Sequence, residues 1–277
     1  MASSAGVEVG VFGGSGFYTF GDSTETITID TPFGATSAPV TVVKVGGRRV
    51  AFIPRHGRHH EFPPARVPAK ANIWAMRTLG VRSVIGPCAA GSLSPAIHRG
   101  DFVVLDQLVD RTWGRPDTYY DSGEPHHVSY ADPYCPALAP LAVAAGERAG
   151  VRMHPTGTVV VIPGPRFSTR AESRWYRSFQ CDVVNMTQDP EAYLARELGM
   201  HYCGIALVTD YDTGVADDLE VEPVTQEEVF AFFDANIGSV RTLLGGLIPT
   251  LPAEPTGCDC AAAVGPLHRY EDGAPRA

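Results

Sequence analysis

The stretch Asn185–Asp212, NMTQDPEAYLARELGMHYCGIALVTDYD, contains a helix pattern, a strand pattern and two carboxylates in succession. Residues Glu191–Leu198 are strong helix formers, and the proline before them suits a first helical turn. The run HYCGIALV is apolar and of strand length, which predicts a strand buried on both faces. Asp210 and Asp212 follow this strand, and alternation would turn both to one side. Because ligands of open α/β sheets bind beyond the carboxyl ends of strands, we interpret both aspartates as candidate catalytic residues, with a solvated turn as the alternative.

The size and charge of the chain limit the classes of protein to which it can belong. Its 277 residues suffice for one large α/β domain or two small ones. A net charge of −9 argues against a nucleic-acid-binding surface, although a local cationic cluster could still bind a small anion. The start has no charged segment followed by an apolar core, and no apolar run is long enough to span a membrane. With six scattered cysteines, the sequence predicts a cytoplasmic protein.

Strand and helix patterns continue along the whole chain. Strands are predicted at 7–12, in three segments between 24 and 53 that form hairpins, and at 81–86, 100–110 and 157–164. Helices are predicted at 67–79, 137–150 and 225–244, the last ended by Gly245-Gly246. From Pro249 the sequence is rich in Pro, Gly and Ala without periodicity, which predicts a flexible tail. Cys258 and Cys260 in this tail are interpreted as two free thiols, with a redox pair or a weak metal site as alternatives.

Two segments near the start of the chain have the composition of an anion site. Gly13–Gly16, which includes Ser15, follows the first strand and can bring backbone N–H groups close to an anion. A dinucleotide fingerprint would need a third glycine where Thr19 stands, so that cofactor is discounted. Two arginines and three histidines occur in residues 55–60, and arginine has the planar fork that suits phosphate. A tight turn and a solvated basic loop are the alternatives.

Further candidates follow other predicted strands. The small residues around Gly91, including Ala89, either bring backbone to a ligand or serve close packing. Phe167 is either a stacking platform for a flat ring or a core aromatic. The loop 111–132 contains His127 and is long enough to suggest a functional role.

The order of several short motifs resembles a known family. GGSGF, DTPFG, PRHGRHH, ANIWAMRTLGV, GDFVVLDQLVDRT, GPRFSTRAES, NMTQDPE and TDYD together are similar to the S-methyl-5′-thioadenosine phosphorylase branch of the trimeric purine nucleoside phosphorylases, over residues 7–250. The resemblance implies one α/β domain, residues 1–250, in which a mixed central β-sheet is flanked by helices, with 251–277 as the tail. It implies a homotrimer whose sites lie near subunit interfaces. It also implies a pentosyltransferase that needs no cofactor and no metal, has inorganic phosphate as co-substrate, and acts on a small nucleoside without nucleic-acid or membrane partners.

The activity implied is phosphorolysis of S-methyl-5′-thioadenosine to adenine and 5-methylthioribose 1-phosphate, in purine and methionine salvage. By resemblance, the phosphate-binding residues are Ser15, Arg55, His56, Thr187 and the backbone of Ala89. The chain departs from the family at Cys88, where relatives have threonine, and a thiol is a weaker hydrogen-bond donor than a hydroxyl.

The base and the 5′ end of the nucleoside are assigned by the same resemblance. Cleavage of the bond to purine N9 builds negative charge on the base, and Asp210 is the expected acid at N7. Its pKa must then be raised by burial beside a second carboxylate. Asp212 is expected to accept from the 6-amino group, so the TDYD motif indicates adenine. The remaining substrate-binding residues implied are Phe167 and Ser168 at the base, Met186 at the ribose, and His127 of a neighbouring subunit with Val229 at the 5′ group.

Three alternatives remain open from the sequence. Gln226 lies where an apolar residue is expected, which favours a broader purine nucleoside phosphorylase acting on adenosine, inosine or other 5′-substituted 5′-deoxyadenosines. The Arg-His-Gly triplet also occurs in histidine phosphatases, but there it lies on the first strand. A non-catalytic nucleoside-binding module is the third alternative.

Overall fold

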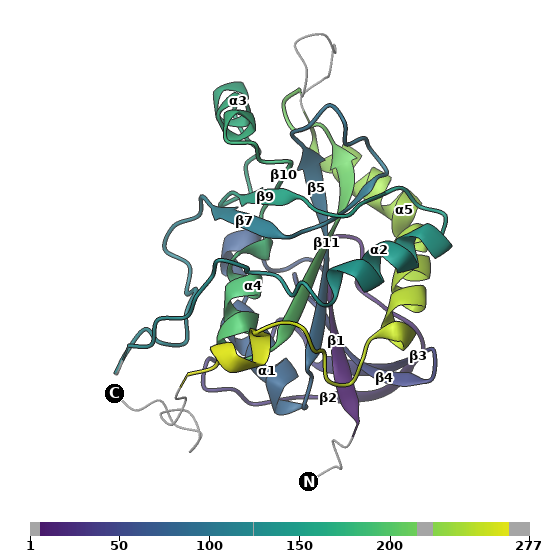
Figure 1. Cartoon of the computed structure of the whole chain (residues 1–277), viewed down its shortest axis with the longest axis vertical. Coiled ribbons are helices and arrows are strands. Elements are labelled where there is room, and N and C mark those ends of the chain that lie inside the picture. The colour runs from purple at the N-terminus through teal and green to yellow at the C-terminus, as the bar shows by residue number, and fades with distance from the viewer. Residues whose placement is uncertain (1–5, 124, 215–223, 266–277) are drawn as a thin grey trace.

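The computed structural model describes residues 6–123, 125–214 and 224–265, and these form one mixed sheet of eleven strands (Figure 1). The order β2-β3-β4-β1-β5-β10-β9-β7 is joined by β11, which pairs with β5 and β6, and by β8, which pairs with β6. The strands are β1 Val7–Gly13, β2 Ser23–Ile27, β3 Val40–Val45, β4 Arg48–Pro54, β5 Ser83–Ser92, β6 Phe102–Val104, β7 Gln107–Asp110, β8 Met153–His154, β9 Thr158–Val161, β10 Val183–Asn185 and β11 His201–Asp210.

Strand β11 lies at the centre of the fold and runs parallel to β5 along its whole length. Its side chains alternate between two cores. Those in one core are Tyr202, Ala206 and Val208, and those in the other are Cys203, Ile205 and Leu207. This alternation is the physical reason for an unbroken apolar run, because both faces of the strand are covered. The prediction of a doubly buried strand that ends at the carboxylates is confirmed.

Helices cover both faces of this sheet (Figure 1). Helices α1 (Ala69–Thr78) and α4 (Gln188–Glu197) pack with the first core, and α2 (Ala139–Arg148) and α5 (Gln226–Leu247) pack with the second. The predicted α/β class, a mixed sheet flanked by helices, is therefore confirmed. A further helix, α3 (Arg170–Ser178), follows Phe167 and Ser168. Short 3₁₀ helices occupy Pro64–Arg66, Ile248–Thr250 and Cys260–Ala263.

The prediction of one strand over residues 100–110 was wrong. β6 pairs antiparallel with β11, whereas β7 pairs parallel with β9, so the chain must change neighbours between them. Asp106 makes this break, since its N–H donates to the Gly157 carbonyl at 3.2 Å and its carboxylate accepts from the Gly157 N–H at 3.0 Å.

The end predicted for the last helix was also wrong, because α5 continues through Gly245-Gly246 to Leu247. Each glycine costs about 1 kcal/mol in a helix interior. Burial of Leu243, Leu244 and Leu247 on the sheet outweighs that cost. The predicted start is confirmed by reciprocal hydrogen bonds between Thr225 and Glu228.

The C-terminal segment packs against the domain, and its 3₁₀ helix Cys260–Ala263 contacts α4. Leu251 and Cys260 are buried, and Arg196 of α4 contacts both carboxylate oxygens of Asp259 at 3.0 Å. Residues 266–277 of the predicted tail lie outside the described part of the chain. Of the helices in the described residues, none has both the length and the apolar character needed to cross a membrane.

Candidate active site

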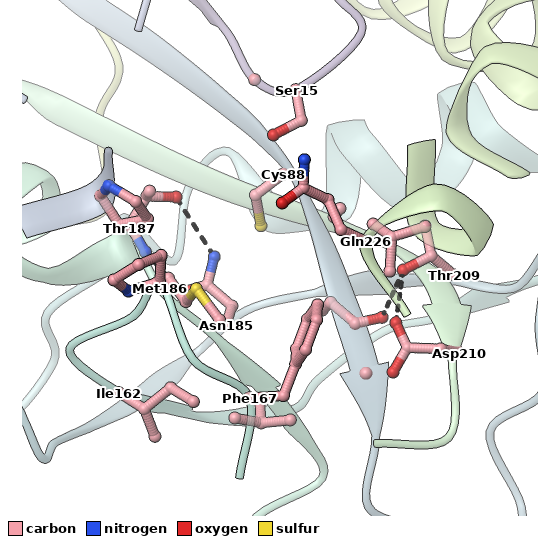
Figure 2. Close-up of a pocket in the computed structure, with 18 of the residues that line it drawn as sticks. Ser15, Cys88, Ile162, Phe167, Asn185, Met186, Thr187, Thr209, Asp210 and Gln226 are labelled. Carbon is pink, nitrogen blue, oxygen red and sulfur yellow. Dashed lines mark hydrogen bonds between the residues drawn. The ribbon is translucent and has the colours of Figure 1, made fainter. Parts of the chain in front are cut away.

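A cavity lies at the carboxyl ends of β1, β4, β5 and β11, where these parallel strands meet at one edge of the sheet (Figure 2). It has about 890 Å³ of empty space, part of it open to solvent. All but two of the residues predicted for the site line it, namely Ser15, Arg55, His56, Ala89, Phe167, Met186, Thr187, Asp210, Asp212 and Val229.

The other two predicted residues lie elsewhere. Ser168 is buried and its hydroxyl is close to the Asp212 carboxylate, so it contributes to the surroundings of that group. His127 is exposed in the long loop and does not line the cavity of its own chain. The basic cluster divides as well, because His60 lines the cavity while Arg58 and His59 are exposed.

Arg55 is held rigidly beneath the cavity. Its Nε donates to Glu191 Oε1, its Nη2 donates to Glu191 Oε2 at 2.9 Å, and its Nη1 donates to the Pro87 carbonyl at 3.2 Å. Both side chains of the pair are 1% exposed, and the Tyr202 hydroxyl donates to Glu191 Oε2 at 2.7 Å. Burial acts to lower the pKa of Arg55, but the Glu191 carboxylate outweighs it and raises the pKa above its usual value. Arg55 is therefore a fixed, permanently charged donor.

His56 is neutral and its tautomer follows from its partner. Burial, and then the charge of Arg55, lower its pKa to about 3. Its Nδ1 lies 2.8 Å from the Phe62 carbonyl, which can only accept, so the ring proton is assigned to Nδ1. Nε2 then has a free lone pair and can accept a hydrogen bond from a ligand.

Thr187 is placed by a residue that the sequence interpretation missed. The Asn185 amide oxygen accepts from the N–H groups of Thr187 at 3.0 Å and Gln188 at 3.1 Å, and its NH₂ group donates to the Thr187 hydroxyl at 3.3 Å (Figure 2). These bonds turn the chain sharply between β10 and α4. Asn185 lies within the NMTQDPE motif, which was the available signal.

Cys88 lines the cavity between its cationic and acidic ends (Figure 2). It is 2% exposed, and burial raises the pKa of its thiol to about 11. The thiol is therefore protonated at neutral pH and can donate only a weak hydrogen bond.

Asp210 ends β11 and projects into the opposite side of the cavity. Its Oδ2 accepts from the Thr209 hydroxyl at 2.7 Å and its Oδ1 accepts from the Asp212 N–H at 2.8 Å. Burial raises its pKa although these hydrogen bonds oppose the shift. Gly91 of β5 makes this position possible, because a Cβ there would lie 2.6 Å from Asp210 Oδ1.

Asp212 reaches the cavity through a turn and not through strand alternation, since its φ is 55°. Burial is the main cause that raises its pKa, to about 6, and the negative charge of Asp210 adds to this effect. Two nearby hydroxyls oppose the shift. Those hydroxyls, on Ser168 and Ser173, lie near it without reaching hydrogen-bonding geometry, and its Oδ2 is a buried acceptor without a partner in the described residues. A carboxylate in this state favours a ligand that donates a hydrogen bond.

The remaining wall of the cavity is mostly apolar. Phe167 and Met186 line it, as do Val229 and Phe230 from the first two turns of α5. Gln226 at the start of α5 also lines the cavity (Figure 2).

Comparisons with known proteins agree with this architecture. The model of the phosphorylase superfamily matches residues 8–246. The S-methyl-5′-thioadenosine phosphorylase of Mycobacterium tuberculosis is 52% identical over 91% of this chain and 92% of its own. A purine nucleoside phosphorylase of Streptomyces coelicolor is 47% identical over 96% of this chain and 97% of its own. The structure of methylthioadenosine phosphorylase from Schistosoma mansoni in complex with adenine superimposes with a TM-score of 0.84 at 35% identity, over 90% of this chain and 93% of that one.

The resemblance that the ordered motifs indicated is therefore confirmed over nearly the whole chain. The chain belongs to the phosphorylase superfamily, and within it to the family of S-methyl-5′-thioadenosine and purine nucleoside phosphorylases.

Proposed function

We propose that the protein cleaves S-methyl-5′-thioadenosine by phosphorolysis, giving adenine and 5-methylthioribose 1-phosphate. Relatives named S-methyl-5′-thioadenosine phosphorylase support the proposal, because two of them are 52% identical to this chain over 91% of its length. The observation that carries it is the division of one cavity into a cationic end at Arg55 and an acidic end at Asp210 and Asp212. A substrate pair of an anion and an amino-purine complements both ends.

At the cationic end, phosphate is the nucleophile. Arg55 donates charge-assisted hydrogen bonds from its fixed position, and the hydroxyls of Ser15 and Thr187 with backbone near Ala89 complete the pocket. His56 Nε2 accepts a hydrogen bond from a protonated phosphate oxygen, which makes that oxygen more negative. A phosphate oxygen then forms a bond to the ribose C1′ as the C1′–N9 bond breaks and its electron pair moves onto the base. No organic cofactor and no catalytic metal is needed for this balance.

At the acidic end, the leaving base is neutralised. Protonated Asp210 donates to N7, and the raised pKa from burial favours the protonated form that this role requires. The Thr209 hydroxyl lies 2.7 Å from Asp210 Oδ2 and 3.4 Å from the Ala90 carbonyl, so it can turn to the carbonyl and release the carboxyl group. Asp212 Oδ2 accepts a hydrogen bond from the 6-amino group, and it has no other partner in the described residues. Phe167 stacks on the purine ring.

The test is release of free base from S-methyl-5′-thioadenosine, adenosine and inosine, each with and without inorganic phosphate. We expect adenine to appear only with phosphate, and Asp210→Asn to lower kcat/KM by about 10²–10⁴-fold while leaving the fold intact. Base release that is independent of phosphate would contradict the cationic end of the site. Preferred cleavage of inosine would contradict the roles of both aspartates. Binding of nucleosides without turnover would support a binding module instead.

A second function, broader purine nucleoside phosphorolysis, is favoured by one observation. Gln226 presents an amide to the cavity where the 5′ group is expected, and an amide can hydrogen-bond a 5′-hydroxyl. The relative from Streptomyces coelicolor is named a purine nucleoside phosphorylase. Comparison of kcat/KM for adenosine and S-methyl-5′-thioadenosine separates the two functions.

We also infer that residues 1–250 act as one catalytic domain and that the working form is a cytoplasmic homotrimer. The match to residues 8–246 supports the domain, and the free cysteines support a reducing compartment. His127 can complete a neighbouring cavity only from another subunit. Exposed aromatics, Trp113 at 84% and Phe179 at 65%, suit a surface that is covered in an oligomer. Light scattering of the purified protein tests the trimer.

A further inference from the structure

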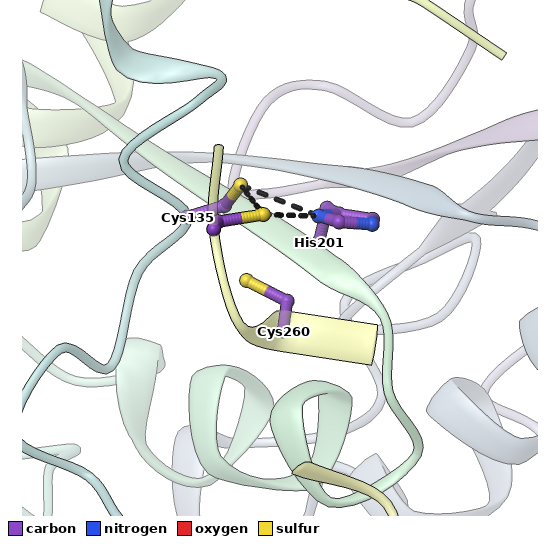
Figure 3. A group of neighbouring side chains, drawn as sticks. Cys135, His201 and Cys260 are labelled. Atoms are coloured by element: carbon purple, nitrogen blue, oxygen red, sulfur yellow. Dashed lines mark hydrogen bonds between the residues drawn. The ribbon is translucent and has the colours of Figure 1, made fainter. Parts of the chain in front are cut away.

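A cluster of soft metal ligands lies at the end of β11 opposite Asp210 (Figure 3). It consists of Cys135, His201, Cys258 and Cys260, which come from the end of the long loop, the first residue of β11 and the C-terminal segment. One ligand atom from each residue lies within 4.8 Å of the others. The cavity lining includes none of these residues, so the proposed reaction does not account for the cluster.

Three of the six separations among these atoms are close to the edges of a tetrahedral zinc site. Cys135 Sγ lies 3.7 Å from Cys258 Sγ and 3.4 Å from His201 Nδ1, and Cys258 Sγ lies 3.3 Å from His201 Nδ1. With Zn–S of about 2.3 Å and Zn–N of about 2.0 Å, tetrahedral geometry gives edges of about 3.8 Å between two sulfurs and about 3.5 Å between sulfur and nitrogen. Figure 3 shows Cys260 beside Cys135 and His201, and its Sγ lies within 4.8 Å of the other ligand atoms.

The backbone holds two of the ligands side by side before any ion binds. The Cys135 N–H donates to the carbonyl of Tyr202, the neighbour of His201, at 2.9 Å. Cys135, His201 and Cys260 are 2–3% exposed, and Cys258 is half-buried. Little reorganisation is therefore needed for the four ligands to close on an ion.

Arg196 lies beside the cluster, and its positive charge complements the negative charge of the zinc-bound form. Three thiolates, one neutral imidazole and Zn²⁺ have a net charge of −1. The Arg196 guanidinium, whose side chain is 4% exposed, lies with Nη1 3.9 Å from Cys260 Sγ. Its other groups donate to Asp259 and to the Ser129 carbonyl, which fixes it at this place. Such neighbours orient ligands and offset charge around metal sites.

We propose that Cys135, His201, Cys258 and Cys260 bind a structural Zn²⁺ ion that fastens the C-terminal segment to the core of the domain. All four positions are used by protein side chains, so no site remains for substrate or catalytic water. A Cys135–Cys258 disulfide is the competing arrangement. It would need a sulfur separation of about 2.05 Å and would leave His201 and Cys260 without a role.

The first experiment measures metal in the full chain purified without chelators from zinc-supplemented cells. We expect elemental mass spectrometry to find about one zinc ion per chain. His201→Asn and Cys260→Ser are expected to lower the zinc content at least tenfold. Cys181→Ser is the matched control, because Cys181 is also buried but belongs to another core, and it should keep the metal.

The second experiment needs no variant and so does not depend on whether the variants fold. A strong chelator should strip the zinc from the wild-type chain and lower Tm, and added Zn²⁺ should restore both. Denatured wild-type protein should then show six reactive thiols. Four thiols with an intact mass about 2 Da lower would establish the disulfide and overturn the proposal. Absence of zinc from a chain with six thiols, or retention of zinc in both ligand variants, would overturn it as well.

Discussion

Substitution of Glu191 by Gln tests whether the buried pair with Arg55 prepares the site for phosphate. The substitution keeps the shape of the side chain but removes its charge, so the guanidinium at 1% exposure loses its counter-charge. Removal of one partner from a buried pair destabilises proteins by about 3–5 kcal/mol. We expect a loss of stability near the lower end of this range, because the amide oxygen of the new side chain can still accept from Arg55 Nε. The cost remains because the amide NH₂ group would face Nη2, which is also a donor.

The expected change in Tm follows from the chain length. An entropy of unfolding of about 2.1 cal/mol/K per residue gives roughly 0.6 kcal/mol/K for 277 residues. A loss of about 3 kcal/mol then lowers Tm by roughly 5 °C. Phosphate should recover part of this loss, because it restores a negative charge beside Arg55 and binds only the folded state.

The assay is thermal unfolding with increasing inorganic phosphate at a fixed protein concentration. We expect phosphate to raise Tm by at least about 2 °C more in Glu191→Gln than in the wild type, equivalent to about 1 kcal/mol of additional stabilisation. Glu197→Gln on the same helix is the control. Glu197 is also buried, but it accepts from the Thr118 hydroxyl and the Tyr119 N–H instead of an arginine. An equal phosphate shift in both variants and the wild type would refute the reasoning.

Three further predictions concern the walls of the cavity. Asp212 must be ionised to accept from the 6-amino group, and its pKa of about 6 means that this acceptor is lost as the pH falls. Adenine affinity measured by calorimetry should therefore drop about tenfold between pH 7 and pH 5, and a flat profile would argue against this contact. Cys88→Thr replaces a weak donor by a hydroxyl worth about 1 kcal/mol, so KM for phosphate should fall roughly fivefold with little change for the nucleoside. Gln226→Val should raise the kcat/KM ratio of S-methyl-5′-thioadenosine to adenosine about tenfold, and an unchanged ratio would place this side chain away from the 5′ group.

The centre of the fold and the candidate site could be predicted from local sequence. Strand β11 is an unbroken apolar run, and the carboxylates, the glycine turn at Ser15 and the basic segment at Arg55 each follow a strand. Parallel strands bring such segments to one edge of the sheet, so local patterns predicted this part of the cavity, whereas Met186, Thr187 and Val229 were assigned by the family resemblance.

The rest depends on contacts between distant segments. Arg55 and Glu191 are 136 positions apart, and nothing near either residue indicates the pair. The strand break at Asp106 exists because two different neighbours are available on either side of it. Cys135 and Cys258 meet across 123 positions, so the pattern in the tail alone favoured free thiols over a redox pair or a metal site. Helix α3 could have been predicted, because Thr169 and Glu172 form a capping box that is visible in the sequence.

The left-handed backbone at Asp212 limits how this site can evolve. At a φ of 55°, asparagine, aspartate and glycine are tolerated, whereas a β-branched residue would strain the turn. Asparagine is therefore the one side chain of similar size that mutation can place there without disturbing the backbone. It would bring an N–H donor to the base in place of a carboxylate acceptor. A single codon change could thus move the preference from amino-purines toward oxo-purines, and the shape of one turn keeps most other changes from surviving selection.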